Sequence, residues 1–211
     1  MQKAYRSSGR RSSKRTRVEY MSNVTWNGNI SRLKTLLDSL SVTGEDGASI
    51  PADEAFERWR DMGVSVRGSG RVIYLIGNGA SASMASHIAA DLAKNAHVHT
   101  QVFTDPALIT ALANDLSYDE IFAEALRRRM GGGDMLAAIS SSGQSENILR
   151  AVRETRELGG NVVTLSAMKP DNALRSMGDI NFHVPADSYG SAETCHAAIL
   201  HYWMDMMTET V

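Results

Sequence analysis

DMLAAISSSGQS, residues 134–145, decides the fold of this chain. Its first half is a continuous apolar run, which is typical of a buried strand in a parallel sheet. Its second half is a loop rich in hydroxyl groups, and a helical pattern follows over residues 146–158. A loop that joins a strand to a helix presents free backbone N–H groups and the positive end of the helix dipole. These residues therefore predict an anion site.

The composition of this loop narrows the choice of anion. No lysine follows it, so it does not fit the nucleotide-binding pattern G-x-x-x-x-G-K-[ST]. Its serines add hydroxyl donors to the backbone N–H groups, which favours a phosphorylated small molecule, most simply a sugar phosphate. An ordinary serine–glycine turn with a capping serine explains the same residues and stays open at this point.

Strand and helix patterns alternate along the rest of the chain. We expect strands at 71–76, 98–103, 135–139, 161–165 and 180–184. We expect helices at 29–40, 52–66, 81–95, 106–113, 118–130, 146–158 and 190–207, with a short helix near 172–177. This alternation predicts an α/β fold, a three-layer doubly wound parallel sheet with right-handed crossovers. The first two helices, joined by a polar link over 41–49, form an N-terminal helical extension.

Length and charge divide the chain into three parts. Its 211 residues suit one domain with an extension. We expect a disordered basic tail at 1–20, N-terminal helices for oligomerisation at 21–70, and a sugar-phosphate-binding domain at 71–211. The tail holds seven of the 22 Lys and Arg residues and one of the 24 acidic residues. Such a tail can bind nucleic acid, but a disordered extension is the simpler interpretation, and we expect no other nucleic-acid contact.

The cellular location follows from two further observations. No apolar stretch approaches the roughly 20 residues that a membrane-spanning helix needs, and the basic tail has no apolar core of the kind that secretory signals carry. The single cysteine, Cys195, argues against a disulfide framework and favours a reducing compartment. We expect a cytoplasmic protein with no membrane partner.

A second loop has the position of a binding site. GNGASA, residues 77–82, follows the first predicted strand and opens a helix, and it fits the dinucleotide pattern G-x-G-x-x-[GA]. Asp105, the candidate ribose-binding acid, lies somewhat late in the chain. A nicotinamide enzyme has no need for the serine loop, so we rank a dinucleotide-binding oxidoreductase last. Both loops follow parallel strands, where ligands bind in open sheets.

Two helices carry histidine together with an acid. His87 and Asp91 are spaced i,i+4, and Glu193 and His201 are spaced i,i+8, so each pair lies close to one helix face. Two imidazoles and two carboxylates can form a divalent-metal site, an acid/base pair, or both. A local salt bridge and ordinary solvated or core histidines explain the same spacing. We interpret His196 as structural.

Taken together, these residues resemble the phosphoheptose isomerases, the sedoheptulose 7-phosphate isomerases of the SIS (sugar isomerase) family. The resemblance covers about residues 29–208. It rests, in chain order, on GNGAS at 77–81, His87 with Asp91, Asn114-Asp115, the serine loop at 140–145, and Glu193 with His201. The serine loop marks only the SIS fold, whereas the three pairs in this order are more specific to the heptose branch.

The resemblance implies a role for each of these residues. The phosphate is held by Ser140, Ser141, Ser142 and Ser145, with Ser81 assisting. The sugar site is lined by Asn78, Gly79, Ala80, Asn114, Asp115 and Glu193. One zinc ion (Zn²⁺) is surrounded by His87, Asp91, Glu193 and His201. Asp91 and His201 also transfer protons. The family further implies a homotetramer with sites at subunit interfaces.

The implied activity is that of a zinc-assisted aldose–ketose isomerase. It converts sedoheptulose 7-phosphate to D-glycero-D-manno-heptose 7-phosphate through an enediol or enediolate. The alternative is a non-catalytic SIS-domain regulator that binds a sugar phosphate, or a protein that binds the replication initiator. Retention of His87 and His201 counts against a binder, since binding needs neither histidine.

Four positions depart from the family pattern. Asp91 stands where the family usually has Glu, and Glu193 stands where it usually has Gln. Asn95 replaces an Arg, and Gly190 replaces an Asp. The shorter Asp91 draws a base back from its substrate, while Glu193 makes the predicted metal shell more negative.

Overall fold

The computed structural model describes residues 25–211, and the predicted basic tail lies outside this range. A seven-stranded sheet forms its centre, with the strand order β2-β1-β7-β6-β5-β3-β4. The parallel strands are β3 (Val72–Gly77), β4 (His99–Val102), β5 (Met135–Ser140), β6 (Asn161–Ala167) and β7 (Ile180–Val184). The predicted α/β class and its parallel strands are confirmed.

The polar link expected over residues 41–49 is wrong. These residues form β1 (Ser41–Gly44), which turns into β2 (Ser49–Ile50) as an antiparallel hairpin. β1 also pairs antiparallel with β7, so the hairpin extends the parallel sheet at one edge. The turn is stabilised by Asp46, whose carboxylate accepts from the Ala48 N–H at 2.9 Å, and by Gly47, whose φ is +77°. Strands this short and polar leave little periodic pattern in a sequence.

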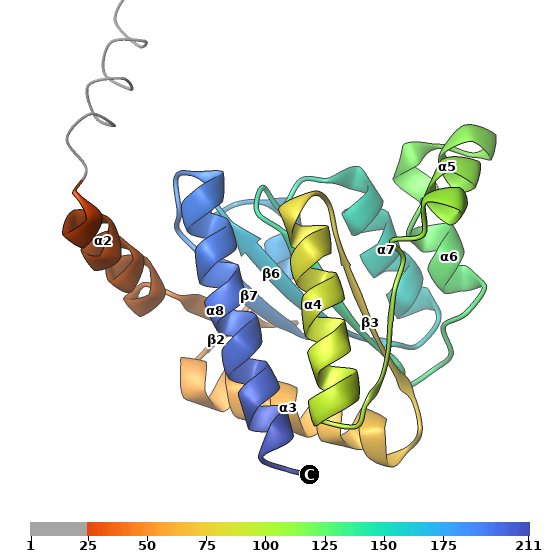
Figure 1. Ribbon diagram of the computed structural model, residues 1–211, viewed down its shortest axis with the longest axis horizontal. Helices are drawn as coiled ribbons and strands as arrows, with labels where there is room; N and C mark the ends of the chain where they lie inside the picture. Colours follow the sequence, from red (N-terminus) through yellow and green to blue (C-terminus); the bar gives the residue numbers. More distant parts are fainter. Residues whose placement is uncertain (1–24) are drawn as a thin grey trace, which may run out of the picture.

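Three helices cover one face of the sheet. They are α3 (Ala52–Gly68), α4 (Ala80–Asn95) and α8 (Tyr189–Thr208), and Figure 1 shows α4 and α8 side by side across the sheet. Trp59 of α3 stacks on Trp203 of α8 with ring centroids 4.1 Å apart, and Phe182 of the sheet packs against Trp59. This buried aromatic cluster fixes the position of α8 relative to the sheet.

The opposite face carries α5 (Pro106–Asp115), α6 (Ala123–Arg127) and α7 (Glu146–Glu157), with the short 3₁₀ helices η1 (Tyr118–Glu120) and η2 (Ala173–Ser176). The predicted helix over 118–130 is therefore wrong, because η1 and α6 are separate elements. Ile121 and Phe122, between them, are buried against α7 and the sheet. With helices on both faces, the predicted three layers are confirmed.

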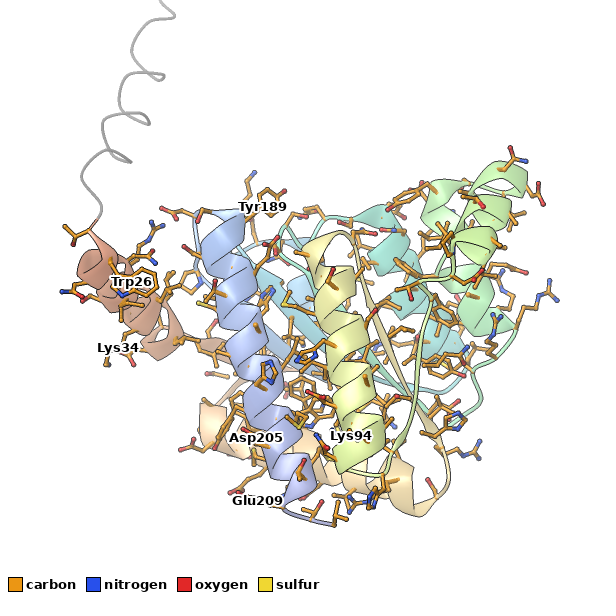
Figure 2. The ribbon with its side chains drawn as sticks, viewed as in Figure 1. Trp26, Lys34, Lys94, Tyr189, Asp205 and Glu209 are labelled. Atoms are coloured by element: carbon orange, nitrogen blue, oxygen red, sulfur yellow. The ribbon has the colours of Figure 1, made fainter. Side chains whose placement is uncertain are left out.

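Within residues 25–211 the first helix is α2 (Trp26–Asp38), which lies at the side of the body next to α8 (Figure 1). Thr25 caps it by accepting the Gly28 N–H at 3.1 Å. Several of its leucines are partly buried against the α3–α8 side, whereas Trp26, labelled in Figure 2, is 74% exposed. Among the helices of residues 25–211, none combines the length and apolar character that crossing a bilayer requires.

Candidate active site

The site begins where β3 and β5 end. Gly77 of β3 pairs with Ile139 of β5, so the loops that follow these strands leave the sheet at the same edge. A Cβ at Gly77 would lie 2.6 Å from the Ser81 backbone, and this close approach lets α4 start directly after the strand. The two loops singled out in the sequence are therefore neighbours.

The serine loop is closed by its own hydrogen bonds. The Gly143 N–H donates to the Ser140 carbonyl at 3.0 Å, and Ser140 Oγ donates to Ser145 Oγ at 3.3 Å. Ser140 and Ser141 are each 6% exposed. Ser145 occupies the N-cap position of α7, yet its side chain makes no capping bond. The N–H groups of Glu146 and Asn147 thus stay available to an anion, whereas the Ile148 N–H already donates within α7.

A hollow of ≈ 170 Å³ opens beside this loop. It brings together seven of the predicted residues, namely Asn78, Ser81, Ser140, Ser141, Ser142, Ser145 and Glu193. Ile139 and Tyr189 complete its lining. Figure 2 shows Tyr189 at the amino end of α8, where the sequence pattern gave no reason to look for a site residue.

A second hollow of ≈ 240 Å³ lies between α4 and α8. His87 and His201 line it, and one ligand atom each of His87, Asp91 and His201 lie within 4.8 Å of one another. His87 Nε2 is 3.4 Å from Asp91 Oδ2. Two imidazoles and a carboxylate are a common donor set for zinc, so these side chains fit a divalent metal.

Glu193 is the fourth predicted metal ligand, and the structure groups it with the serines. It lies on α8, two turns before His201, and its side chain lines the serine hollow. The cluster of possible ligand atoms contains His87, Asp91 and His201 without it. A carboxylate at this place puts negative charge beside the predicted phosphate site.

Four other predicted residues lie outside both hollows and outside the His87–Asp91–His201 cluster. Gly79 and Ala80 are exposed at the start of α4. Asn114 and Asp115 are exposed at the end of α5, where Asn114 Nδ2 donates to Asp115 Oδ1 at 2.9 Å. Their part in a sugar site stays a prediction.

Two residues that the sequence analysis missed contact the site through Asn78. The Asn147 side chain exchanges two hydrogen bonds with the Asn78 side chain, at 3.0 and 2.9 Å. The Tyr118 hydroxyl donates to Asn78 Oδ1 at 3.0 Å. A signal for Asn147 existed, because it lies four residues before Ala151 on the apolar face of α7, and a polar residue on a buried face needs a partner.

Two histidines behind the serine loop are buried. His196 Nε2 lies 3.1 Å from the Ser166 carbonyl, and His183 Nδ1 lies 3.3 Å from Ser166 Oγ. Burial lowers the pKa of each to about 4, and the Arg175 charge adds to the effect on the pKa of His183. Both imidazoles are therefore neutral at pH 7, in keeping with a structural role for His196.

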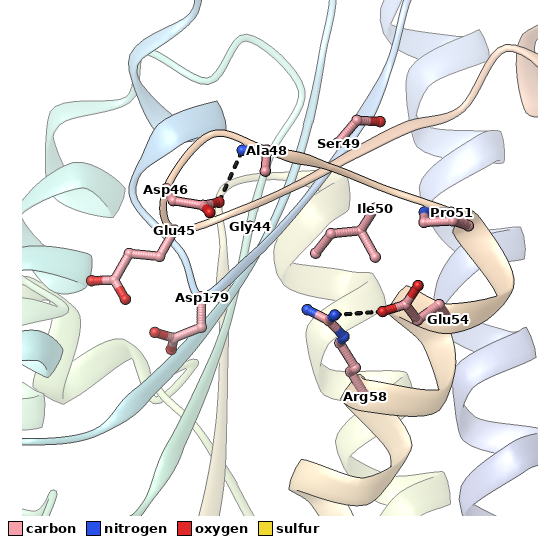
Figure 3. A pocket seen from close by; sticks show the side chains of 10 residues that line it. All are labelled: Gly44, Glu45, Asp46, Ala48, Ser49, Ile50, Pro51, Glu54, Arg58 and Asp179. Carbon is pink, nitrogen blue, oxygen red and sulfur yellow. Dashed lines mark hydrogen bonds and ion pairs between the residues drawn. The ribbon is translucent and has the colours of Figure 1, made fainter.

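The hollow in Figure 3 is larger, ≈ 560 Å³, but it lies elsewhere. The β1–β2 turn, the start of α3 and Asp179 form its walls. Asp179 accepts from the Val162 N–H near the start of β6, so this hollow faces the amino ends of the parallel strands. Its acids have partners, since Arg58 pairs with Glu54 and Arg156 pairs with both Glu45 and Asp179.

Comparisons with known proteins agree with this fold. A family model described as the SIS domain matches residues 41–167, a stretch that starts at β1. The chain is 32% identical over 190 residues to a phosphoheptose isomerase of Shewanella denitrificans, covering 85% of this chain and 96% of that protein.

Solved structures are similar over nearly the whole chain. A phosphoheptose isomerase from Francisella tularensis has a TM-score of 0.72 at 25% identity, covering 95% of this chain and 100% of that one. Another from Neisseria gonorrhoeae has a TM-score of 0.73 at 23% identity, covering 92% and 98% respectively, which supports the fold.

Proposed function

The chain belongs to the SIS domain family and to its phosphoheptose isomerases, and from this membership we propose that it interconverts sedoheptulose 7-phosphate and D-glycero-D-manno-heptose 7-phosphate. One observation supports the proposal above all others. A serine-lined hollow at the start of α7 and a His87–Asp91–His201 cluster share helix α8, which contributes Glu193 to the first and His201 to the second.

The serine loop would hold the phosphate of the substrate. The free N–H groups at the start of α7 and the hydroxyls of Ser140, Ser141, Ser142 and Ser145 can all donate to phosphate oxygens. Ser81 lines the same hollow and would assist. A substrate anchored at its phosphate presents its reacting carbons in a fixed orientation, which lowers the barrier to reaction.

Asp91 and His201 would move the protons. Converting a 2-ketose to an aldose requires the removal of a proton from the carbon next to the carbonyl and its return to the neighbouring carbon. A carboxylate suits the transfer at carbon, and an imidazole can carry a hydroxyl proton near neutral pH. The Asp91 side chain is partly shielded by α4 and α8, which favours proton transfer to a substrate over exchange with bulk water.

A zinc ion would be held by His87, Asp91 and His201, with Glu193 as the fourth predicted ligand. When bound, zinc would polarise the substrate carbonyl as a Lewis acid. Asp91 carries two oxygens, so one can contact a metal while the other faces the substrate. His87 lies at the solvent side of the cluster, where it can turn toward an ion without disturbing the core.

Glu193 would make the site depend on a cation. Its carboxylate lines the hollow proposed for the phosphate, and two negative groups in one hollow repel each other. A divalent ion near Glu193 offsets this repulsion. The Gln usual in the family has no charge at this position, so the requirement would be stronger in this chain.

We also propose the assembly and the location. Asn114 and Asp115 lie outside the serine hollow, and α2 exposes Trp26, so a homotetramer in which neighbouring subunits complete each site fits both observations. The cytoplasm is the proposed location. Cys195 is buried on α8, and its burial raises the pKa of the thiol, which keeps it unreactive in a reducing compartment.

The direct test is turnover. Purified protein is incubated with sedoheptulose 7-phosphate, with and without added zinc, and the aldose phosphate is followed by chromatography. We expect conversion that depends on zinc and stops on chelation. Absence of turnover on heptose and pentose phosphates alike, with zinc present, would overturn the proposal and leave a sugar-phosphate-binding protein.

A further inference from the structure

The side chains of Asn78 and Asn147 form a reciprocal pair beside the serine hollow. Asn78 Nδ2 donates to Asn147 Oδ1 at 3.0 Å, and Asn147 Nδ2 donates to Asn78 Oδ1 at 2.9 Å. Asn78 follows β3 and lines the hollow, whereas Asn147 is 2% exposed in the first turn of α7. The pair therefore links the two loops of the site.

A backbone group fixes which way the pair is oriented. The Ile148 N–H lies 3.0 Å from the Asn147 side-chain oxygen, and a backbone N–H can only donate. The atom facing it is thus Oδ1, and Asn147 must turn its Nδ2 toward Asn78. The atom of Asn78 that receives this bond is then Oδ1, and its Nδ2 faces Asn147 Oδ1.

Tyr118 completes the arrangement from a third element, η1. Its hydroxyl lies 3.0 Å from Asn78 Oδ1, and because that oxygen can only accept, the hydroxyl must donate. η1 is itself held against α7 by an ion pair between Glu120 and Arg150. Tyr118 therefore connects the segment that follows α5 to the amide of Asn78.

This arrangement leaves Asn78 with one unused group. Its Oδ1 already accepts two hydrogen bonds, and one N–H of its Nδ2 donates to Asn147. The second N–H has no acceptor among residues 25–211, and Asn78 lines the hollow. The side chain can offer a ligand a donor and no acceptor.

We propose that Asn147 and Tyr118 are positioning residues, which hold Asn78 as a hydrogen-bond donor to an oxygen of the bound sugar phosphate. The identity of that ligand rests on the proposed function. Neither positioning residue touches the ligand. They affect ligand binding only through the orientation of the Asn78 amide. Removing Asn147 or the Tyr118 hydroxyl should therefore weaken binding only while Asn78 is present.

A double-mutant cycle tests this dependence. Tyr118→Phe removes one hydroxyl from a residue that is 54% exposed, so the fold is preserved. Tyr118→Phe, Asn78→Ala and the double variant are compared with the unchanged protein for kcat/KM and, by calorimetry, for the Kd of sedoheptulose 7-phosphate. Tyr202→Phe is the matched control, since it removes the hydroxyl of another half-exposed tyrosine whose ring packs edge-on against Phe56.

We expect Tyr118→Phe to weaken binding and kcat/KM about fivefold in the presence of Asn78, the usual effect of one hydrogen bond. In the Asn78→Ala background we expect less than about a twofold effect, since the bond no longer exists. Asn147→Asp keeps the acceptor for Ile148 and removes the donor to Asn78, and we expect it to follow the same dependence.

The outcomes separate this inference from the proposed function. Equal effects of Tyr118→Phe in both backgrounds, or an effect matched by Tyr202→Phe, would overturn the positioning role while turnover stands. Binding that follows the expected cycle without any turnover would overturn the isomerase alone. If sedoheptulose 7-phosphate does not bind, the cycle is measured with inorganic phosphate, and an unchanged Kd in all variants overturns the role of Asn78 as donor.

Discussion

The imidazole of His201 on α8 lies edge-on to the imidazole of His87 on α4, with ring centroids 5.2 Å apart. The two residues are far apart in sequence and meet because α4 and α8 pack against the same face of the sheet. Asp91, one turn after His87, adds a carboxylate to the pair. This meeting is what a metal site across two helices requires.

Removing His201 should release a bound zinc. Outer-shell changes alone lower metal affinity by about 10–100-fold, so we expect His201→Ala to lose at least this much, with turnover falling in parallel. Metal content of the purified variants, measured by mass spectrometry, checks this. His99→Ala, which removes an exposed histidine of β4, should keep its metal. Stoichiometric zinc in His201→Ala would contradict the proposed ligand set.

The serine loop should not tolerate a side chain at Gly143. Its φ is +61°, and a Cβ there would lie 1.9 Å from Asn172 Oδ1. We expect Gly143→Ala to lower the free energy of unfolding by more than about 3 kcal/mol and to abolish phosphate binding. Gly47→Ala is the control, because Gly47 has a φ of +77° with nothing within 4 Å.

In Gly47→Ala the added methyl group meets no neighbour, so the only loss of stability is the cost of holding alanine at a positive φ, about 1–2 kcal/mol. Urea unfolding of both variants measures the difference. Equal losses of stability in the two would mean that the packing of Asn172 against the loop contributes nothing.

Neutralising Glu193 should strengthen binding of the substrate phosphate and weaken binding of the metal ion. Removing a negative charge near a bound anion is worth about 1 kcal/mol when the charges are 4 Å apart in water, so we expect Glu193→Gln to lower KM about fivefold at saturating zinc. Glu209→Gln is the control, at the opposite end of α8 from Tyr189 (Figure 2). Steady-state kinetics check this, and a higher KM in Glu193→Gln would assign the carboxylate a direct role in binding substrate.

Acid should destabilise the protein through His183 and His196. Their pKa values are about 4 in the folded protein and about 6.5 when exposed, so between these values the unfolded chain binds more protons. Stability is therefore complete above about pH 6.5 and is lost as the pH falls toward 4. The free energy of unfolding falls by at most about 1.4 kcal/mol per pH unit for each histidine.

Urea unfolding between pH 7 and pH 5 measures this slope. We expect His196→Gln, whose amide can still donate to the Ser166 carbonyl, to flatten it by about half. His99→Ala, at an exposed position, should leave it unchanged. If the unfolding free energies of His196→Gln and the unchanged protein depend on pH with the same slope, the buried His196 imidazole does not cause the acid sensitivity.

The parallel strands, the helices between them and the two loops could be predicted because long apolar runs and helical periodicity are local properties. β7, at Ile180–Val184, has the predicted bounds. The hairpin at Ser41–Ile50 was missed because its strands are short and polar, and what stabilises them is pairing with β7, a partner distant in sequence. The break between η1 and α6 was missed because Ile121 and Phe122 continue a helical pattern while tertiary packing decides their conformation.

The candidate site follows the same rule: residues set by local sequence patterns could be predicted, and those set by contacts between elements could not. The serine loop and the His87–Asp91 pair follow from local spacing, Asn78 follows from the family resemblance, and His201 joins His87 and Asp91 in the fold. Tyr118 and Asn147 were missed because they join the site through contacts between elements, and Tyr189 was missed because only the fold brings the start of α8 to the serine hollow. Glu193 shows that spacing can also mislead. Helical spacing puts it near the face of His201, whereas it lines the serine hollow.

Helix α8 fixes a length as well as a set of groups. Glu193 and His201 stand eight positions apart on one uninterrupted helix, which corresponds to about 12 Å along its axis. A continuous helix keeps this distance constant, unlike a loop. The stack of Trp203 on Trp59 also holds α8 in place against α3. Under the proposed chemistry the serine hollow, which Glu193 lines, and the histidine cluster cannot move apart, so the enzyme would select a phosphorylated sugar by the length of its carbon chain.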